Sequence, residues 1–154
     1  AEVHYHSRSK KNNNYQFHAS PKELAKNVDV LFIITPGGNE TKHLVDASVL
    51  EALGTSGTLI NISRGSVVDE KALIKALQTG KIGAAGLDVF DAEPVVPNEL
   101  KNMPNVILTP HVGSATIETR QAMGDLTCDN LLSFFKTGQV LTPVPECLKL
   151  NVQR

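Results

Sequence analysis

Short apolar runs alternate with helical patterns along most of the chain. The run VLFII at residues 30–34 is apolar at every position, which is typical of a strand buried on both faces. Four other runs have the length and composition of strands. The strands predicted in this way cover residues 3–6, 30–34, 58–62, 84–89 and 106–109.

Helices are predicted between these strands from their capping residues and apolar stripes. The clearest is residues 69–79, which Asp69 caps and Gly80 ends. The predicted helices cover residues 21–26, 46–53, 69–79 and 116–136. Because strands and helices alternate, we expect an α/β fold with a doubly wound parallel sheet.

Length and composition exclude several classes of protein. The chain has 154 residues, of which 41% are hydrophobic and 20% charged, as in an ordinary globular domain. No apolar run approaches the roughly 18 residues of a membrane span, so we expect no membrane partner. The net charge of −1 argues against a nucleic-acid partner bound by bulk charge.

The two cysteines, Cys128 and Cys147, form no metal-binding spacing with histidine. We therefore predict no metal site, and free thiols in a reducing, cytoplasmic location. Positive charge gathers near the start, where residues 1–26 hold five basic and two acidic side chains. A local basic site is therefore predicted in this segment.

In parallel sheets ligands bind beyond the carboxyl ends of the strands, so the residues there are candidates for a site. These ends carry a basic cluster, a small-residue turn, an arginine, an aspartate and a histidine. In chain order they are Ser7-Arg8-Ser9-Lys10-Lys11, Thr35-Pro36-Gly37-Gly38, Ser63-Arg64-Gly65, Asp88 and Pro110-His111-Val112-Gly113-Ser114.

Two of these side chains, and Glu93 in the loop after residues 84–89, could do chemistry, and each has a plainer explanation. Arg64 could hold a carboxylate in a two-pronged contact, or be a surface arginine at a turn. His111 could transfer a proton, or be a turn histidine with ordinary hydrogen bonds. Glu93, in the sequence DAEP, could orient a histidine, or be a loop glutamate.

The SRSKK cluster follows the first predicted strand. In a dinucleotide-binding sheet, the residue at the end of the corresponding strand binds the adenosine ribose. An acid there binds the 2′-hydroxyl of NAD, whereas an arginine with nearby hydroxyls suits the 2′-phosphate of NADP. The chain has no acid at this point. The cluster therefore suits NADP, with NAD possible, and a solvated basic turn is the alternative.

Three segments together resemble the D-isomer-specific 2-hydroxyacid dehydrogenases, in particular the glyoxylate/hydroxypyruvate reductase branch. They are VDVLFIITPGGNETKHLV, LINISRGSVVDEKALIKALQTGKIGAAGLDVFDAEP and NVILTPHVGSAT. The resemblance implies a Rossmann-type cofactor-binding domain over residues 1–141. It also implies a tail, residues 142–154, that returns to a substrate domain. The implied activity is NAD(P)H-dependent reduction of a small 2-oxo acid to the D-2-hydroxy acid, by a homodimer.

The resemblance also assigns roles to individual residues. It implies that Arg64 binds the substrate carboxylate, that His111 is the acid/base and that Glu93 keeps His111 protonated. Asp88 matches the residue that binds the nicotinamide carboxamide. The other implied cofactor contacts are Ser7, Arg8 and Ser9 at the 2′-phosphate, Thr35, Pro36, Ile62 and Ser63 in the turns that line the cofactor, and Gly113 and Ser114 beside the nicotinamide.

The chain departs from the family in one respect. It contains no GxGxxG motif, and residue 1 falls at what should be the second strand of the cofactor domain. In the strand order 3-2-1-4-5-6 the first strand lies at the centre of the sheet. We therefore expect a C-terminal part of a longer enzyme, lacking its first strand and glycine-rich loop, with negligible cofactor binding and turnover by itself.

Two other functions remain open. One is a phosphoglycerate or formate dehydrogenase type within the same family, against which the SRSKK cluster argues. The other is a dinucleotide-sensing, corepressor-like binding protein with the same fold, for which the sequence shows no partner-binding motif.

Overall fold

The computed structural model describes residues 1–148, and the chain divides into two compact units. The first unit is Ala1–Gly113, and the second begins at Ser114. We describe each unit by itself. The boundary that we predict for the cofactor domain, at residue 141, falls inside the second unit and stays a prediction.

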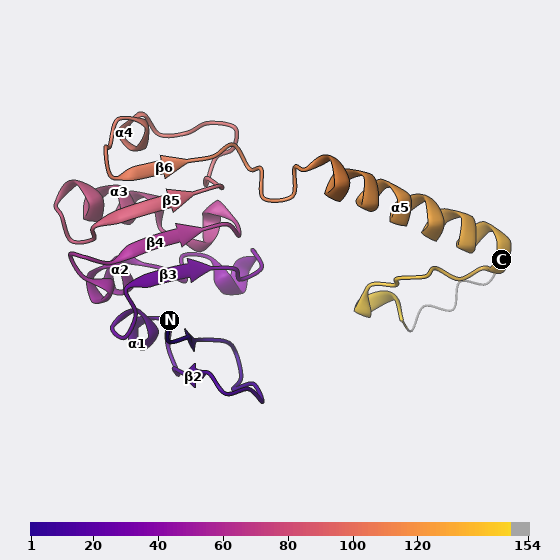
Figure 1. Ribbon diagram of the computed structural model, residues 1–154, viewed down its shortest axis with the longest axis horizontal. Helices are drawn as coiled ribbons and strands as arrows, with labels where there is room; N and C mark the ends of the chain where they lie inside the picture. Colours follow the sequence, from indigo (N-terminus) through magenta and orange to yellow (C-terminus); the bar gives the residue numbers. More distant parts are fainter. Residues whose placement is uncertain (149–154) are drawn as a thin grey trace. The chain divides into compact units, whose positions relative to one another are not determined.

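Four parallel strands form the main sheet of the first unit (Figure 1). Their order in the sheet is their order in the chain, and Val30, Thr58 and Ala84 are aligned across the first three. All four start and end within two residues of the predicted runs. The strands are β3 (Val30–Ile33), β4 (Thr58–Asn61), β5 (Ala84–Leu87) and β6 (Val106–Leu108).

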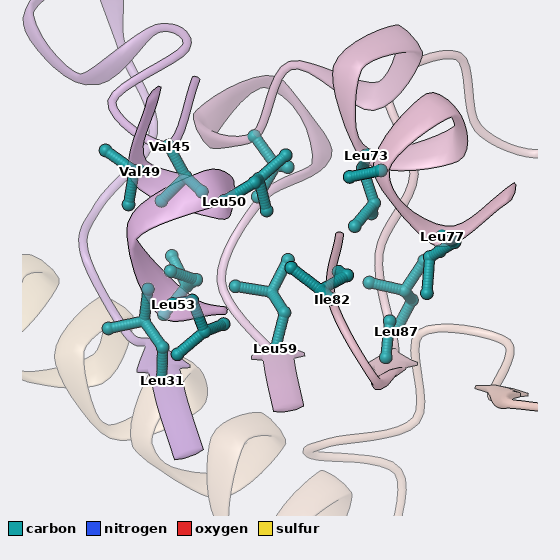
Figure 2. Close-up of a cluster of buried hydrophobic side chains, with 14 of the residues drawn as sticks. Leu31, Val45, Val49, Leu50, Leu53, Leu59, Leu73, Leu77, Ile82 and Leu87 are labelled. Carbon is teal, nitrogen blue, oxygen red and sulfur yellow. The ribbon is translucent and has the colours of Figure 1, made fainter. Parts of the chain in front are cut away.

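Helices α1 (Pro21–Ala25), α2 (Ala47–Leu53), α3 (Glu70–Gln78) and α4 (Asn98–Lys101) contribute to one apolar core with this sheet. The N-termini of the first three helices are capped by the side chains of Ser20, Asp46 and Asp69. Each of these side chains accepts a backbone N–H of the first turn. Figure 2 shows the centre of this core. The fully buried side chains at the centre are Leu50, Leu59, Leu73 and Ile82.

The side chains of the main sheet alternate between this core and the opposite face. Leu31 and Ile33 point into the core, whereas Phe32 and Ile34 are 60% and 76% exposed. Ile107 on β6 is 73% exposed. Helices of Ala1–Gly113 therefore cover one face of the sheet, and apolar side chains occupy the other.

A separate two-stranded parallel sheet is formed by β1 (His4–Tyr5) and β2 (Gln16–Phe17). We did not predict β2, because two residues with a polar first position give no apolar run. His4 and His18 lie beside this pair, with their rings stacked and hydrogen-bonded at 2.9 Å. Among the described residues no strand pairs with both β1 and β3, so the sheet is split where the central first strand is predicted to be lacking.

The second unit contains one long helix, α5 (Ile117–Thr137), close to the predicted bounds. Thr116 caps its start, and Gly138 ends it with a left-handed φ of 77°. The tail has a short 3₁₀ turn, Pro145–Cys147, and residues 149–154 lie outside the described part of the chain. No helix in the described residues is long and apolar enough to span a bilayer.

The cap of α2 makes a testable contribution to stability. Asp46 accepts the backbone N–H groups of Ser48 and Val49 at 2.8 and 3.0 Å. The hydrogen bonds from Ser48 and Val49 hold the pKa of Asp46 below its ordinary value of 3.8. We expect D46A to lower the free energy of unfolding by about 1 kcal/mol near neutral pH, measured by urea unfolding.

The pH dependence follows from the direction of this pKa shift. A lowered native pKa stabilises the fold above the ordinary pKa of the carboxyl, and that stabilisation is lost as the pH falls through the native value. The difference between D46A and the wild type should therefore shrink as the pH falls below 3.8. D46N is the control, since asparagine caps a helix without titrating; equal stability of D46A and the wild type at neutral pH would contradict the assignment.

Candidate functional site

A cleft of about 890 Å³ lies beyond the carboxyl ends of the main-sheet strands. It is built from the segments that follow β3, β4 and β5, together with His111 after β6. Its lining includes seven residues to which the resemblance assigns a role: Thr35, Pro36, Ile62, Ser63, Arg64, Glu93 and His111.

Arg64 stands in the turn after β4 with extended backbone angles, φ −142° and ψ 145°. Its guanidinium donates to the Ser63 carbonyl at 2.6 Å, and its aliphatic stem lies against Gly37. A Cβ at Gly37 would approach Arg64 Cγ to 2.8 Å, so glycine is needed for this contact. The remaining guanidinium N–H groups are positioned at a cleft, where they could bind a carboxylate.

Glu93 and His111 are hydrogen-bonded to each other at the same cleft. His111 Nδ1 lies 2.9 Å from Glu93 Oε2, and both side chains are partly exposed. Glu93 Oε1 also accepts the backbone N–H of Phe90 at 3.0 Å. The hydrogen bond from His111, with that from Phe90, holds the pKa of Glu93 below its ordinary value, so Glu93 is a carboxylate near neutral pH. With Nδ1 held in this way, Nε2 of His111 is the nitrogen free to exchange a proton with a ligand.

The turn that carries His111 has a left-handed backbone, with φ at 54°. Such a conformation is uncommon for a residue with a Cβ and needs support from its surroundings. Asp88, which is 6% exposed, provides it by accepting the backbone N–H groups of Val112 and Gly113, each at 2.9 Å. The Thr109 hydroxyl donates to the same carboxylate.

The pKa of Asp88 reflects these contacts. Burial raises the pKa, but the hydrogen bonds from Thr109, Val112 and Gly113 outweigh burial and leave it below the ordinary value. Oδ1 accepts two of these bonds and Oδ2 one, so Oδ2 keeps a lone pair for one more donor, although Asp88 is buried and does not line the cleft. That capacity suits the carboxamide contact that the resemblance implies for Asp88.

The basic cluster lies outside the cleft lining. Ser7 donates to the Ser9 carbonyl at 2.6 Å, which closes a tight turn after β1. Arg8 is 95% exposed and lies 3.4 Å from Glu40, in the 3₁₀ turn Asn39–Thr41 that follows β3. The predicted 2′-phosphate residues are thus next to the segment after β3, but they do not line the cleft itself.

The remaining predicted residues are placed by local contacts. Gly113 closes the first unit and packs on Asp88, whereas Ser114 opens the second unit. Sequence reasoning missed Asn61 and Thr109, whose side chains hold the turns of Arg64 and His111. A polar residue at an inward-facing strand position is the signal that could have revealed Asn61.

Among the described residues no group of histidine, cysteine, aspartate or glutamate side chains has an arrangement suited to a metal ion. Cys128 and Cys147 are free and exposed.

The parallel sheet, with its cleft beyond the carboxyl ends of the strands, defines a Rossmann-type nucleotide-binding fold. Residues 1–113 match the family model described as the NAD binding domain of D-isomer specific 2-hydroxyacid dehydrogenases. The chain belongs to this family.

Named relatives agree with this assignment. A hydroxyphenylpyruvate reductase from Plectranthus scutellarioides is 50% identical over 143 residues, which are 92% of this chain and 46% of the relative. A glyoxylate/hydroxypyruvate reductase A from Arabidopsis thaliana is 49% identical over 92% of this chain and 46% of its own. This chain therefore spans slightly less than half the length of these relatives.

A solved structure is similar over the same part. It is the NADPH-dependent glyoxylate/hydroxypyruvate reductase from Sinorhizobium meliloti in complex with NADP and malonate. It superposes with a TM-score of 0.92 at 50% identity, over 94% of this chain and 46% of the other.

The close approach of two turns in the cleft gives a second prediction. A Cβ at Gly65 would lie 2.0 Å from the Phe90 carbonyl carbon and 2.3 Å from the Asp91 nitrogen, both of them backbone atoms. We expect G65A to push the Arg64 turn away from the Glu93 loop and to lower kcat/KM of the full-length protein by at least about 100-fold, since small misplacements cost this much.

G124A is the matched control, because a Cβ at Gly124 in α5 meets nothing within 4 Å. It should leave kcat/KM unchanged and slightly favour the helix. A G65A protein with wild-type kcat/KM in a steady-state assay would show that the two turns need not be in contact.

Proposed function

We propose that this chain is the cofactor-binding part of an NADPH-dependent reductase that converts a small 2-oxo acid to the D-2-hydroxy acid. The observation that carries the proposal is one cleft lined by Arg64 and by the hydrogen-bonded pair Glu93–His111. A cation for the carboxylate and a proton donor for the carbonyl oxygen are what this reduction requires. The names of the relatives supply the class of substrate, glyoxylate and hydroxypyruvate.

Each side chain has a distinct role in the proposed reaction. Arg64 binds the substrate carboxylate and polarises the adjacent carbonyl, which stabilises the negative charge that develops on its oxygen. His111 donates a proton from Nε2 to that oxygen. Glu93 holds the opposite ring nitrogen at 2.9 Å, which orients the ring and stabilises its protonated form.

Residues at the cleft support the binding of the adenosine and nicotinamide halves of the cofactor. Thr35, Pro36, Ile62 and Ser63 line the cleft, and Asp88 Oδ2 keeps capacity for one more donor. When bound, the cofactor supplies the hydride. The sequence contains no GxGxxG motif, the glycine-rich turn that would hold the pyrophosphate.

Further properties of the whole protein are part of the same proposal. We propose a homodimer with a cytoplasmic location, as the family resemblance implies. That the 154 residues are inactive alone also stays a prediction, which the split sheet and the relatives' greater length support.

The roles of Arg64 and His111 are tested by conservative variants of the full-length protein. R64K keeps the charge but loses the two-pronged contact, so we expect KM for hydroxypyruvate to rise about tenfold or more. H111N should lower kcat by about 100- to 10,000-fold, because the proton donor is lost. Both are read from the rate of NADPH oxidation, followed by the loss of absorbance of the reduced nicotinamide.

H43N is a matched control for H111N. His43 also has a left-handed backbone, with φ at 52°, and is exposed outside the cleft lining. H43N should keep wild-type kcat.

A wild-type protein that binds NADPH but does not turn over hydroxypyruvate or glyoxylate would instead favour the dinucleotide-sensing function.

Arg8 is tested through the choice of cofactor. If its guanidinium binds the 2′-phosphate, R8A should raise KM for NADPH by about tenfold or more while leaving KM for NADH within about twofold. K26A, which removes another basic side chain from the same N-terminal segment, should change neither value. An R8A protein with unchanged KM for NADPH would exclude Arg8 from the 2′-phosphate site.

A further inference from the structure

Asn61, the last residue of β4, is a polar side chain enclosed by the core. It is 1% exposed, and the described residues contain only two other buried polar side chains, Ser63 and Asp88. A buried amide must find partners for both its ends, because an unsatisfied polar group in the core is costly. Asn61 finds both in the turn that carries Arg64.

The amide of Asn61 spans this turn. Its oxygen accepts the backbone N–H of Ser63 at 3.1 Å, and its nitrogen donates to the Arg64 carbonyl at 3.1 Å. The same carbonyl accepts the backbone N–H of Val67 at 3.2 Å, from the 3₁₀ turn that follows. Asn61 therefore ties the Ile62–Ser63 and Arg64–Gly65 peptide groups, which flank the Ser63–Arg64 peptide, to the end of a buried strand.

These contacts reach the guanidinium through Ser63. Its N–H is held by the Asn61 oxygen, and its carbonyl accepts from the Arg64 guanidinium at 2.6 Å. On its other side, the aliphatic stem of Arg64 packs against Gly37. The guanidinium thus bonds to the carbonyl of a residue whose N–H is held by Asn61, and Asn61 also holds the next carbonyl along the chain.

We propose that Asn61 is a positioning residue that sets the guanidinium of Arg64 for the carboxylate of the 2-oxo acid. The proposal rests on the function proposed above for Arg64. Asn61 does not line the cleft, so it acts through the Arg64 turn and not by touching the substrate. Asparagine is suited to this role because one planar group both accepts and donates without carrying charge.

The test is N61D in the full-length protein. Aspartate has the same shape but, when ionised, loses the N–H that Arg64's carbonyl needs. Near neutral pH we expect KM for hydroxypyruvate to rise about tenfold, while Kd for NADPH stays within about twofold. As the pH falls, the introduced carboxyl takes up a proton and regains a donor, so KM of N61D should approach that of the wild type at the same pH.

N105D is the matched control. Asn105 is half-buried and donates to the Gly83 carbonyl at 2.8 Å, at the opposite end of the strands from the cleft. The same exchange there removes the same kind of hydrogen bond, and should lower Tm without changing KM. If N61D changed only Tm, as N105D does, Asn61 would be merely structural and the proposal overturned.

Two further results separate this proposal from the function it rests on. Raised KM in R64K with unchanged KM in N61D would overturn the role of Asn61 alone. Unchanged KM in R64K would overturn the role of Arg64 and that of Asn61 together.

If N61D does not accumulate as folded protein, N61S serves in its place, because serine introduces no charge. Unchanged KM for hydroxypyruvate in N61S likewise overturns the proposal.

Discussion

The hydrogen bonds between β3, β4, β5 and β6 determine where the turns that carry Arg64 and His111 lie. Because the four strands are parallel and in register, their carboxyl ends finish at one edge. Residues as far apart in the chain as Thr35 and His111 therefore line one cleft. A shift in the register of any one strand would move its turn relative to the others, so the site depends on the pairing as much as on its own side chains.

The turns at this edge are held by polar groups that the core encloses. Asn61 holds the turn after β4, and Asp88 holds the left-handed turn after β6. Both side chains come from the ends of adjacent strands and bond to backbone groups. In each case the buried group restricts the backbone, and the backbone then aims a more exposed side chain. This arrangement keeps Arg64 and His111 accessible to a ligand while limiting their freedom.

Much of this could be predicted from the sequence, for reasons that particular residues make clear. The helix after Asp69 has a cap, an apolar stripe and a terminal glycine, so three local signals agree on it. Arg64 and His111 became candidates because strand ends meet in a parallel sheet, whereas Glu93 lies in a loop and its pairing with His111 was implied only by the family resemblance. β2 was missed because its two residues owe their conformation to pairing with β1, a contact that no local pattern records.

Asn61 was missed for a different reason. It lies within a run of strand residues, TLINI, where it adds nothing to the apolar pattern that predicts the strand. Its importance comes from two backbone groups in the next turn, and their positions depend on the folded chain. The contact between Arg8 and Glu40 was missed in the same way, since it joins segments 32 residues apart.

The apolar face of the main sheet has a consequence for how the stability of this protein is measured. Phe32, Ile34 and Ile107 lie on a face that the helices of Ala1–Gly113 leave open. Whatever binds there stabilises the folded unit by mass action, whether it is another segment of the same polypeptide or a separate molecule. The melting temperature of this unit is therefore a property of the unit together with its surroundings, and it will vary with protein concentration wherever the occupant is a separate molecule.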